Sequence, residues 1–427
     1  MRKQWLSVLV VGMAFGTAWA VRGQFGHEEG AAWAAAAGTM SLVLVSGRKD
    51  WYSKILLITL SAAIGWGAGG MISYGKVVGY GRSTEFTNAG YGLIMLFVIG
   101  GLYGLIGGGF AGLSLWSSDR NKVKWTSIIA EMAAGGVIFY YLFIVQFEFL
   151  MTPPRSEAWA VCMGAGLALL WHMARNKLQT PLRIAFISAM GAGFGFAFGN
   201  FLQITGNILQ INFNMWNVME YSIGFFGGTS MAYAVFTSEW PEETLSVQPW
   251  ENISAWSIVF AFIPTVVFIN SRFYEILASA GHSAQALNEI TRAGAIVSLL
   301  VVIALIAITL ARTIHKRNKF NRSDARVFFF LMFGTYIFLS YAVTGAFSGS
   351  FHLNHHLYIV NFGVILFLLS RKYPSFFPAG SRRLEIHGTR WLLYLGIIIV
   401  FIMLLAFFLV NMHGELNGAG SRFPNIL

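Results

Sequence analysis

The chain has 427 residues, of which 56% are hydrophobic and only 11% are charged, and its formal net charge is +11. A soluble domain carries about 25% charged residues, because its surface must face water. The composition therefore excludes an ordinary soluble protein. The basic residues lie in short connectors between apolar runs, so the net charge does not indicate a nucleic-acid partner. The sequence predicts an all-α, polytopic integral membrane protein in contact with membrane lipids.

Thirteen apolar runs approach the ~20 residues that a helix needs to cross a bilayer. They must be helical, because no water inside the bilayer satisfies free backbone groups. The first also resembles a signal peptide, but we expect it to remain as a helix. In chain order the predicted spans are approximately 5–21, 31–46, 54–74, 89–116, 125–150, 157–174, 184–205, 217–238, 254–274, 293–311, 327–350, 356–370 and 391–411.

The connectors between these spans predict an orientation. With the N-terminus in the cytoplasm, the cytoplasmic connectors hold 22 of the 29 Lys and Arg residues, as the positive-inside tendency requires. The acidic connector 239–252 is the exception on that side. Because the number of spans is odd, the C-terminus is expected outside, and a bacterial cytoplasmic membrane is the expected location. No connector is long enough for a soluble catalytic domain, so any binding must be done by the spans and their ends.

Glycines are spaced four residues apart in several spans, at 100, 104, 108 and 112 and again at 191, 195 and 199. Small residues at this spacing let helix backbones approach closely in lipid. The spans 293–311 and 391–411 have almost no glycine, and we expect them at the lipid-facing periphery.

An internal repeat is indicated by "GMAFGTAWAVRGQ" (12–24) and "GAGFGFAFGNFLQ" (191–203), which share glycine, phenylalanine, alanine and glutamine positions. Six spans separate the two, so both helices run in the same direction. Two six-helix halves, 1–178 and 179–371, related by an axis along the membrane normal would produce this pattern. A C-terminal helix and tail, 372–427, would follow them.

This arrangement resembles major-facilitator-type transporters, in which twelve helices form two such halves. The connector "SGRKDWYSK" (46–54) is similar, in Gly47-Arg48-Lys49, to that superfamily's cytoplasmic motif between its second and third helices. The motif's upstream aspartate and the family's long central loop are absent here, and the thirteenth span is extra. No phosphate-binding loop, dinucleotide fingerprint or haem-attachment pair occurs, so no cofactor is expected.

The segment "RGQFGHEEG" (22–30) places polar side chains between two apolar spans. Ionisable groups near or in spans are costly and are functional candidates. A structural alternative is an external turn in which the carboxylates cap the second helix and pair with the arginine. We predict that this segment binds a solute through Arg22, Gln24, His27, Glu28 and Glu29.

Further candidates follow along the chain. Amides alternate with aromatic residues in 199–221, which suits a hydroxyl-rich ligand or, alternatively, an interfacial amphipathic turn; Asn200, Gln203 and Glu220 are the expected contacts. In the fifth span, Glu131 and Glu148 are predicted ion-coupling carboxylates, although Glu131 could instead pair with Lys124.

Three histidines, His352, His355 and His356, are spaced to share a helix face and could bind a metal or relay protons. No cysteine or acid lies beside them, and we predict no metal site. All these candidates except Glu131 are expected on the external side, which predicts an outward-facing cavity.

The leading hypothesis is a secondary active transporter that moves a small polar, carbohydrate-like solute by symport with protons or sodium. It predicts a central cavity between the halves, lined by Glu131 and Asn200. The alternative is an integral-membrane transferase for a lipid-linked or envelope substrate, with His27 and the histidines at 352–356 around a cavity open to lipid. A non-catalytic scaffold would have its polar groups paired and no cavity.

Overall fold

A computed structural model describes residues 2–241, 243–270, 283–316, 319–342, 353–371, 374–378 and 388–423. About 80% of the chain is helical, and the described residues contain no strand. Ten of the described helices are long and apolar enough to cross a membrane, and the bent pair α4 and α5 would make 11. The all-α prediction is confirmed, and these helices are compatible with a multi-pass membrane protein.

The helices of the first part of the chain are α1 (Arg2–Arg22), α2 (Glu28–Ser46), α3 (Lys49–Ser53), α4 (Ile55–Gly70), α5 (Gly75–Gly81), α6 (Phe86–Trp116), α7 (Trp125–Phe139) with the π-helix η1 (Tyr140–Gln146), and α8 (Ser156–Arg175). They are followed by α9 (Gln179–Ile208), α10 (Met215–Phe236), α11 (Pro249–Trp256) with η2 (Ser257–Phe262) and α12 (Ile263–Ile269), α14 (Ala284–Lys316), α15 (Arg322–Tyr341), α16 (Leu353–Ser370) and α17 (Gly388–Met412). Each predicted span overlaps a described helix, although 254–274 covers α11, η2 and α12, and residues 271–274 and 343–350 lie outside the described ranges. The number of thirteen crossings stays a prediction.

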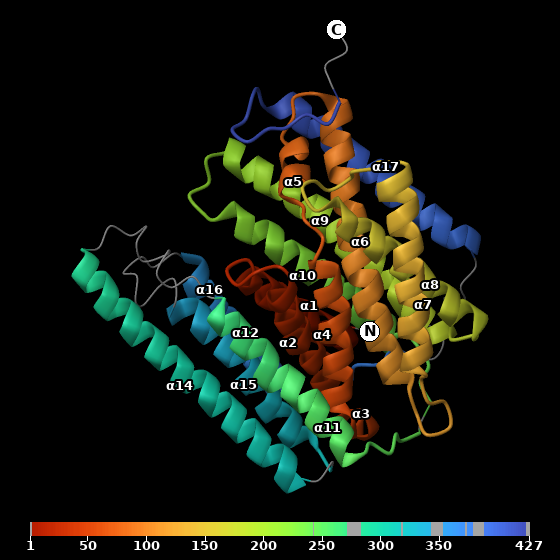
Figure 1. Ribbon diagram of the computed structural model, residues 1–427, viewed down its shortest axis with the longest axis vertical. Helices are drawn as coiled ribbons and strands as arrows, with labels where there is room; N and C mark the ends of the chain where they lie inside the picture. The colour runs from red at the N-terminus through yellow and green to blue at the C-terminus, as the bar shows by residue number, and fades with distance from the viewer. Residues whose placement is uncertain are drawn as a thin grey trace.

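Helix α10 lies between α1 and α9 in the centre of the molecule (Figure 1). A Cβ added at Gly12 of α1 would come 2.1 Å from Thr229 Oγ1, and one added at Gly191 of α9 would come 2.1 Å from Ser230 Oγ. The two glycines that match in the internal repeat therefore abut neighbouring residues of one helix. The segments 12–24 and 191–203 thus share a packing partner, α10, while the repeat of two six-helix halves stays a prediction.

The glycines of α6 bring its backbone against α9. A Cβ at Gly104 would lie 2.1 Å from the Ser188 carbonyl oxygen, and one at Gly100 would lie 2.5 Å from that of Ala192. No side chain larger than hydrogen fits at such a distance, so the spacing of small residues sets how closely these helices pack.

The remaining helices surround this centre (Figure 1). Helices α12, α15 and α16 pack against α1 and α2, and the long α14 lies outside them, while α17 crosses α6 and α9 on another side. The most apolar windows of α14 and α17 are 28% and 22% buried, against 72% in α1 and α6. Their expected peripheral position is confirmed.

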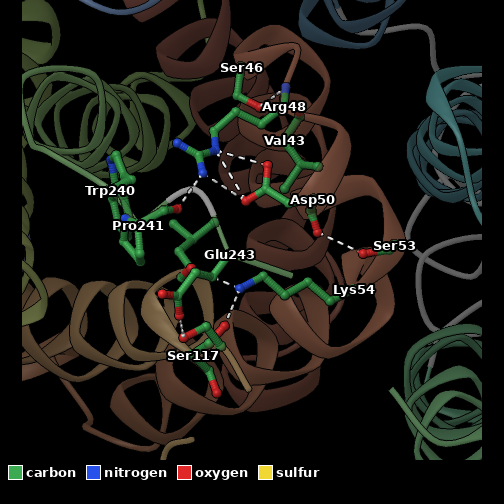
Figure 2. A network of polar contacts seen from close by, with 12 residues as sticks. Val43, Ser46, Arg48, Asp50, Ser53, Lys54, Ser117, Trp240, Pro241 and Glu243 are labelled. Atoms are coloured by element: carbon green, nitrogen blue, oxygen red, sulfur yellow. Dashed lines mark hydrogen bonds and ion pairs between the residues drawn. The ribbon is translucent and has the colours of Figure 1, made fainter. Parts of the chain in front are cut away.

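Several connectors, most of them basic, meet at one end of the bundle, which we call the basic end (residues 47–54, 117–124, 176–178, 237–241 and 243–248). Figure 2 shows Arg48 in a paired contact with Asp50 and donating to the Pro241 carbonyl at 2.6 Å. Lys54 donates to the carbonyls of Leu115 and Ser117, at the end of α6. These contacts fix the connector after α2 against those after α6 and α10.

The acidic connector predicted on the basic side does lie there. Glu243 pairs with Arg120 at 3.0 Å and accepts a hydrogen bond from Ser118. Asp119 accepts hydrogen bonds from the Ser246 amide and hydroxyl at 2.8 and 2.6 Å. The acidic residues of connector 239–252 thus offset the positive charge of the neighbouring connectors, which explains why an acidic segment occurs among basic ones.

Candidate functional site

A cavity of about 350 Å³ lies at the end of the bundle opposite the basic end. It is bounded by the end of α1, the break between α4 and α5, and the start of α10. Its polar lining consists of Gln24, His27, Tyr74, Asn214, Asn217 and Glu220, and Trp216 adds an aromatic face. The cavity can therefore accept a small polar ligand that also presents an apolar surface.

A buried ion pair lies beside this cavity, and its acidic partner, Glu220, is part of the lining. Arg22 Nη1 lies 2.7 Å from Glu220 Oε2, and the two side chains are 1% and 5% exposed. The Tyr74 hydroxyl donates to Glu220 Oε1 at 2.6 Å and accepts from Arg22 Nη1 at 3.2 Å. The three side chains form a closed triad, in which both charges are compensated and hydrogen-bonded as burial requires.

Each member of the triad is placed by a helix end or break. Arg22 is the last residue of α1, which continues beyond the apolar run. Tyr74 lies in the short segment between α4 and α5, whose axes differ by 65°. Glu220 is in the second turn of α10. The guanidinium also lies 5.2 Å from the centre of the Trp19 ring, a cation–π contact that stabilises its charge.

His27 extends the triad toward the cavity mouth. Its Nδ1 lies 3.0 Å from Arg22 Nη2, and since a guanidinium can only donate, this geometry suits a neutral ring that accepts there. Partial desolvation, and next the Arg22 charge, lower the pKa of His27. His27 is therefore held neutral near pH 7 beside a fixed cation.

Gln24 joins the same region to α15 and α16. Its Nε2 lies 2.9 Å from His355 Nε2, and the Ser340 hydroxyl donates to its Oε1. Residues 22–30 and the later histidines thus meet through Gln24 and His355. His356 packs near the Tyr341 ring instead, and His352 lies outside the described residues. The part of the chain that the structure describes contains no group of three or more metal-ligating side chains.

A second, mostly apolar cavity of about 510 Å³ adjoins the first between α1, α10 and α16, and Asn217 lines both. Asn217 Nδ2 donates to the Ala20 carbonyl at 3.0 Å and contacts the Tyr358 hydroxyl. Tyr358 also donates to Ala20, at 3.2 Å. This hydrogen-bonded cluster separates a polar space from an apolar one.

The other predicted solute ligands lie away from the cavity. Glu28 pairs with Arg155 at 2.7 Å on an exposed surface. Glu29 stands in the first turn of α2 and has no ion pair among the described residues. Asn200 and Gln203 are fully buried and bond each other at 3.0 Å beside α5 and α10, without lining either cavity.

The predicted ion-coupling residues are also elsewhere. Glu131 lies near the basic end, 3.0 Å from His172 Nδ1 and 2.7 Å from Arg175 Nη2, and does not pair with Lys124. Glu148 is exposed in the connector after η1, with a positive φ of 49°. Neither residue lines the cavity beside Arg22.

Two tyrosines of this region, Tyr74 and Tyr358, were not predicted from the sequence. Tyr74 follows a glycine-dense stretch, 65–70, at the expected end of a span, which is a signal for a broken helix. Tyr358 has no such signal, because a tyrosine near a span end is ordinarily an interfacial residue.

No family model, curated protein or solved structure matches this chain.

Proposed function

We propose that this protein is a secondary active transporter of a small polar solute, by symport with protons or sodium, and that the cavity beside Arg22 is its outward-facing binding site. The Arg22–Glu220 pair carries the proposal. Burying two charges costs several kcal/mol per ion unless both are well compensated. A site for a polar solute needs such charges. If these two positions served only to pack helices together, apolar side chains would do so equally well.

The triad suggests how coupling would work. Arg22 keeps its positive charge, so we assign the coupling ion to its partner, Glu220. When the coupling ion occupies Glu220, Arg22 loses its compensating charge and is free to bind an acidic or hydroxyl group of the solute. We therefore assign coupling to Glu220 in preference to Glu131 and Glu148, which lie far from the cavity lining.

The broken helix supports the same function. Discontinuous helices in transporters leave backbone groups free at the substrate site, and irregular backbone is tolerated in a membrane only where it is buried or lines a cavity. The break between α4 and α5 places Tyr74 and Gly75 in the cavity lining. Opening or closing this bend would move Tyr74 relative to Glu220.

The number of membrane crossings and their orientation are part of the same proposal. We infer that α2, α10 and the bent α4–α5 pair also cross the membrane, which gives thirteen crossings, a cytoplasmic N-terminus and an external C-terminus in a bacterial cytoplasmic membrane. The cavity is lined from both predicted halves, 1–178 and 179–371. That position, between halves, is where a transporter of the expected architecture binds its solute.

Uptake into proteoliposomes tests this function. The purified protein is expected to accumulate a member of a panel of sugars, polyols, amino acids and small acids when a proton or sodium gradient is imposed. The accumulation should collapse when an ionophore removes the gradient. Failure of every solute under both gradients would contradict transport.

A transferase acting on a lipid-linked substrate is the second candidate, and one observation favours it. The polar cavity holding His27 adjoins the apolar cavity through Asn217, so a polar head and an alkyl chain could be held together. His27 would then be the general base, and its lowered pKa leaves it neutral and able to accept a proton. A change in mass of an added lipid-linked sugar, abolished by His27→Gln, would favour this candidate over transport.

A further inference from the structure

A cavity of about 210 Å³ at the basic end is formed by the ends of α1, α2, α15 and α16. These four helices also meet at the opposite end, where Gln24 of α1 contacts Ser340 and His355 and where Tyr336 of α15 donates to the Gly30 carbonyl. The volume is below the ~300–1,000 Å³ of pockets for drug-sized ligands. The cavity therefore fits a small ligand or a single headgroup.

Two arginines, Arg322 and Arg371, line this cavity. Within the described ranges, neither has a carboxylate within ion-pair distance. Arg322 Nε is buried without a hydrogen-bond partner, and the Arg371 guanidinium lies over the Phe367 ring at 4.4 Å. A buried guanidinium nitrogen without an acceptor is unfavourable, so the site is incomplete as it stands.

Among the described residues, the nearby acids already have partners of their own. Asp324 is already held by Arg312 at 2.6 Å and by Lys316 at 3.8 Å. Asp50 is held by Arg48 at 2.8 Å. The first amides of α15 are capped by the Asn321 side chain. Two guanidiniums that share one space without an anion repel each other, and an added oxyanion would remove that repulsion.

The rest of the lining fits a compact anion. Gly47 has φ +70°, and a Cβ there would meet nothing within 4 Å, so its backbone borders open space. Ser7 lines the cavity and forms a hydrogen bond with Ser375 at 3.2 Å. Val10 and Leu369 make the remaining walls apolar, which lowers the local dielectric and strengthens an arginine–oxyanion contact.

We propose that Arg322 and Arg371 form a binding site for a phosphate-type oxyanion at the basic end, separate from the solute cavity. Arginine presents a planar fork of donors that matches phosphate geometry, which favours phosphate over a halide. The anion is either free phosphate or the headgroup of an anionic lipid, since both offer the same oxygens. This site does not depend on the transport proposal.

Equilibrium binding of inorganic phosphate tests the site. The full chain, purified in an uncharged detergent at low ionic strength, is titrated calorimetrically. Arg322→Gln is expected to weaken binding by roughly ten-fold or more, because a charge-assisted contact is lost. Arg371→Gln should weaken it several-fold, and Arg322→Lys should fall between wild type and Arg322→Gln. The matched control is Arg326→Gln, an equal charge change at an exposed position of α15 that does not line the cavity.

A second arm separates the two sources of phosphate. The protein is placed in nanodiscs of neutral lipid, with and without phosphatidylglycerol. It is then released in a native mass spectrometer, which measures the mass of the protein and of any lipid that stays bound. A headgroup site is identified if the wild type retains phosphatidylglycerol, both arginine variants lose it, and free phosphate does not bind. Binding of free phosphate identifies a soluble oxyanion. The double variant Arg22→Met/Glu220→Gln, which leaves no buried charge uncompensated, should change neither result, and this separates the site from the solute cavity.

The proposal is overturned if neither probe binds, or if Arg326→Gln weakens binding as much as Arg322→Gln does, since that result means simple charge screening. Should Arg322→Gln fail to fold, Arg371→Gln decides alone, because Arg371 is exposed at the end of α16.

Discussion

At the scale of single residues, the buried pair Arg22–Glu220 is the observation on which the proposed function rests. The partners are 198 positions apart in the sequence, and neither side chain is more than 5% exposed. Sequence reasoning identified both as candidates, because charge inside an apolar run is conspicuous. It could not pair them, since nothing in a sequence states which distant helix ends meet. It also assigned Glu28 to the same cluster, whereas Glu28 pairs with Arg155.

Glu220→Gln should destabilise the protein by about 3–5 kcal/mol, because it leaves the Arg22 charge buried without compensation. The double variant Arg22→Met/Glu220→Gln should recover most of that loss, since no buried charge remains. Denaturant unfolding in detergent, followed by circular dichroism, measures both. The control is Arg155→Gln, which breaks an exposed pair and should cost no more than about 1 kcal/mol. Equal losses from the two single variants would contradict the burial argument.

His27 predicts a pH dependence. Its pKa is lowered in the folded protein, so as the pH falls below its ordinary value the unfolded chain takes up a proton more readily than the folded one. The contribution of His27 to stability is therefore present above about pH 6.5 and lost as the pH falls below it. As the pH is lowered from about 7.5 to 5, the melting temperature of the wild type should therefore approach that of His27→Gln or fall below it. Parallel curves would refute the assignment.

At the scale of helices, the apolar runs predicted where the long helices lie, because in a membrane the length of an apolar run and the length of its helix are physically linked. Ten of the described helices are long and apolar enough to cross, and the count of thirteen stays a prediction. The bend between α4 and α5 was missed, since a glycine-rich stretch is compatible with tight packing as well as with a break. The predicted lining by Asn200 was also not found, because that amide turns toward Gln203 inside the bundle.

The glycine contacts give a prediction at this scale. Gly104→Ala should cost about 1–3 kcal/mol or more, because its methyl group would meet the rigid Ser188 carbonyl. Gly363→Ala on α16 is the matched control: a Cβ there meets nothing within 4 Å, and alanine favours the helix by up to about 1 kcal/mol. Unfolding of both variants in detergent measures the difference. A Gly104→Ala protein as stable as the control would show that α6 and α9 pack differently.

At the scale of the whole molecule, the way in which distant helices pack together decides which residues meet in the candidate site. The sequence gives only weak signals for which helices pack together. The central position of α10 between α1 and α9 followed from no single motif, although the repeated glycines pointed to a common packing role. The charge counts had placed the acidic connector 239–252 on the side of the basic ones, but only the structure shows which residues of these connectors contact one another. The orientation across the membrane stays a prediction.

Cysteine labelling tests the proposed thirteen crossings. The single native cysteine, Cys162, is buried and should not react with a maleimide. In intact cells an impermeant maleimide is expected to label Glu85→Cys and His413→Cys, at the end opposite the basic end. Asp119→Cys and Ser246→Cys should react only after permeabilisation. Labelling of both pairs from one side would contradict the topology.

The central claim is that the Arg22–Glu220 pair exists for solute binding rather than for stability. Solute uptake by the stable double variant Arg22→Met/Glu220→Gln, in proteoliposomes under an imposed gradient and beside Arg155→Gln, tests it most directly. We predict normal folding with uptake abolished in the double variant, and near wild-type uptake in Arg155→Gln. Wild-type uptake by the double variant would show that the pair is not the solute site.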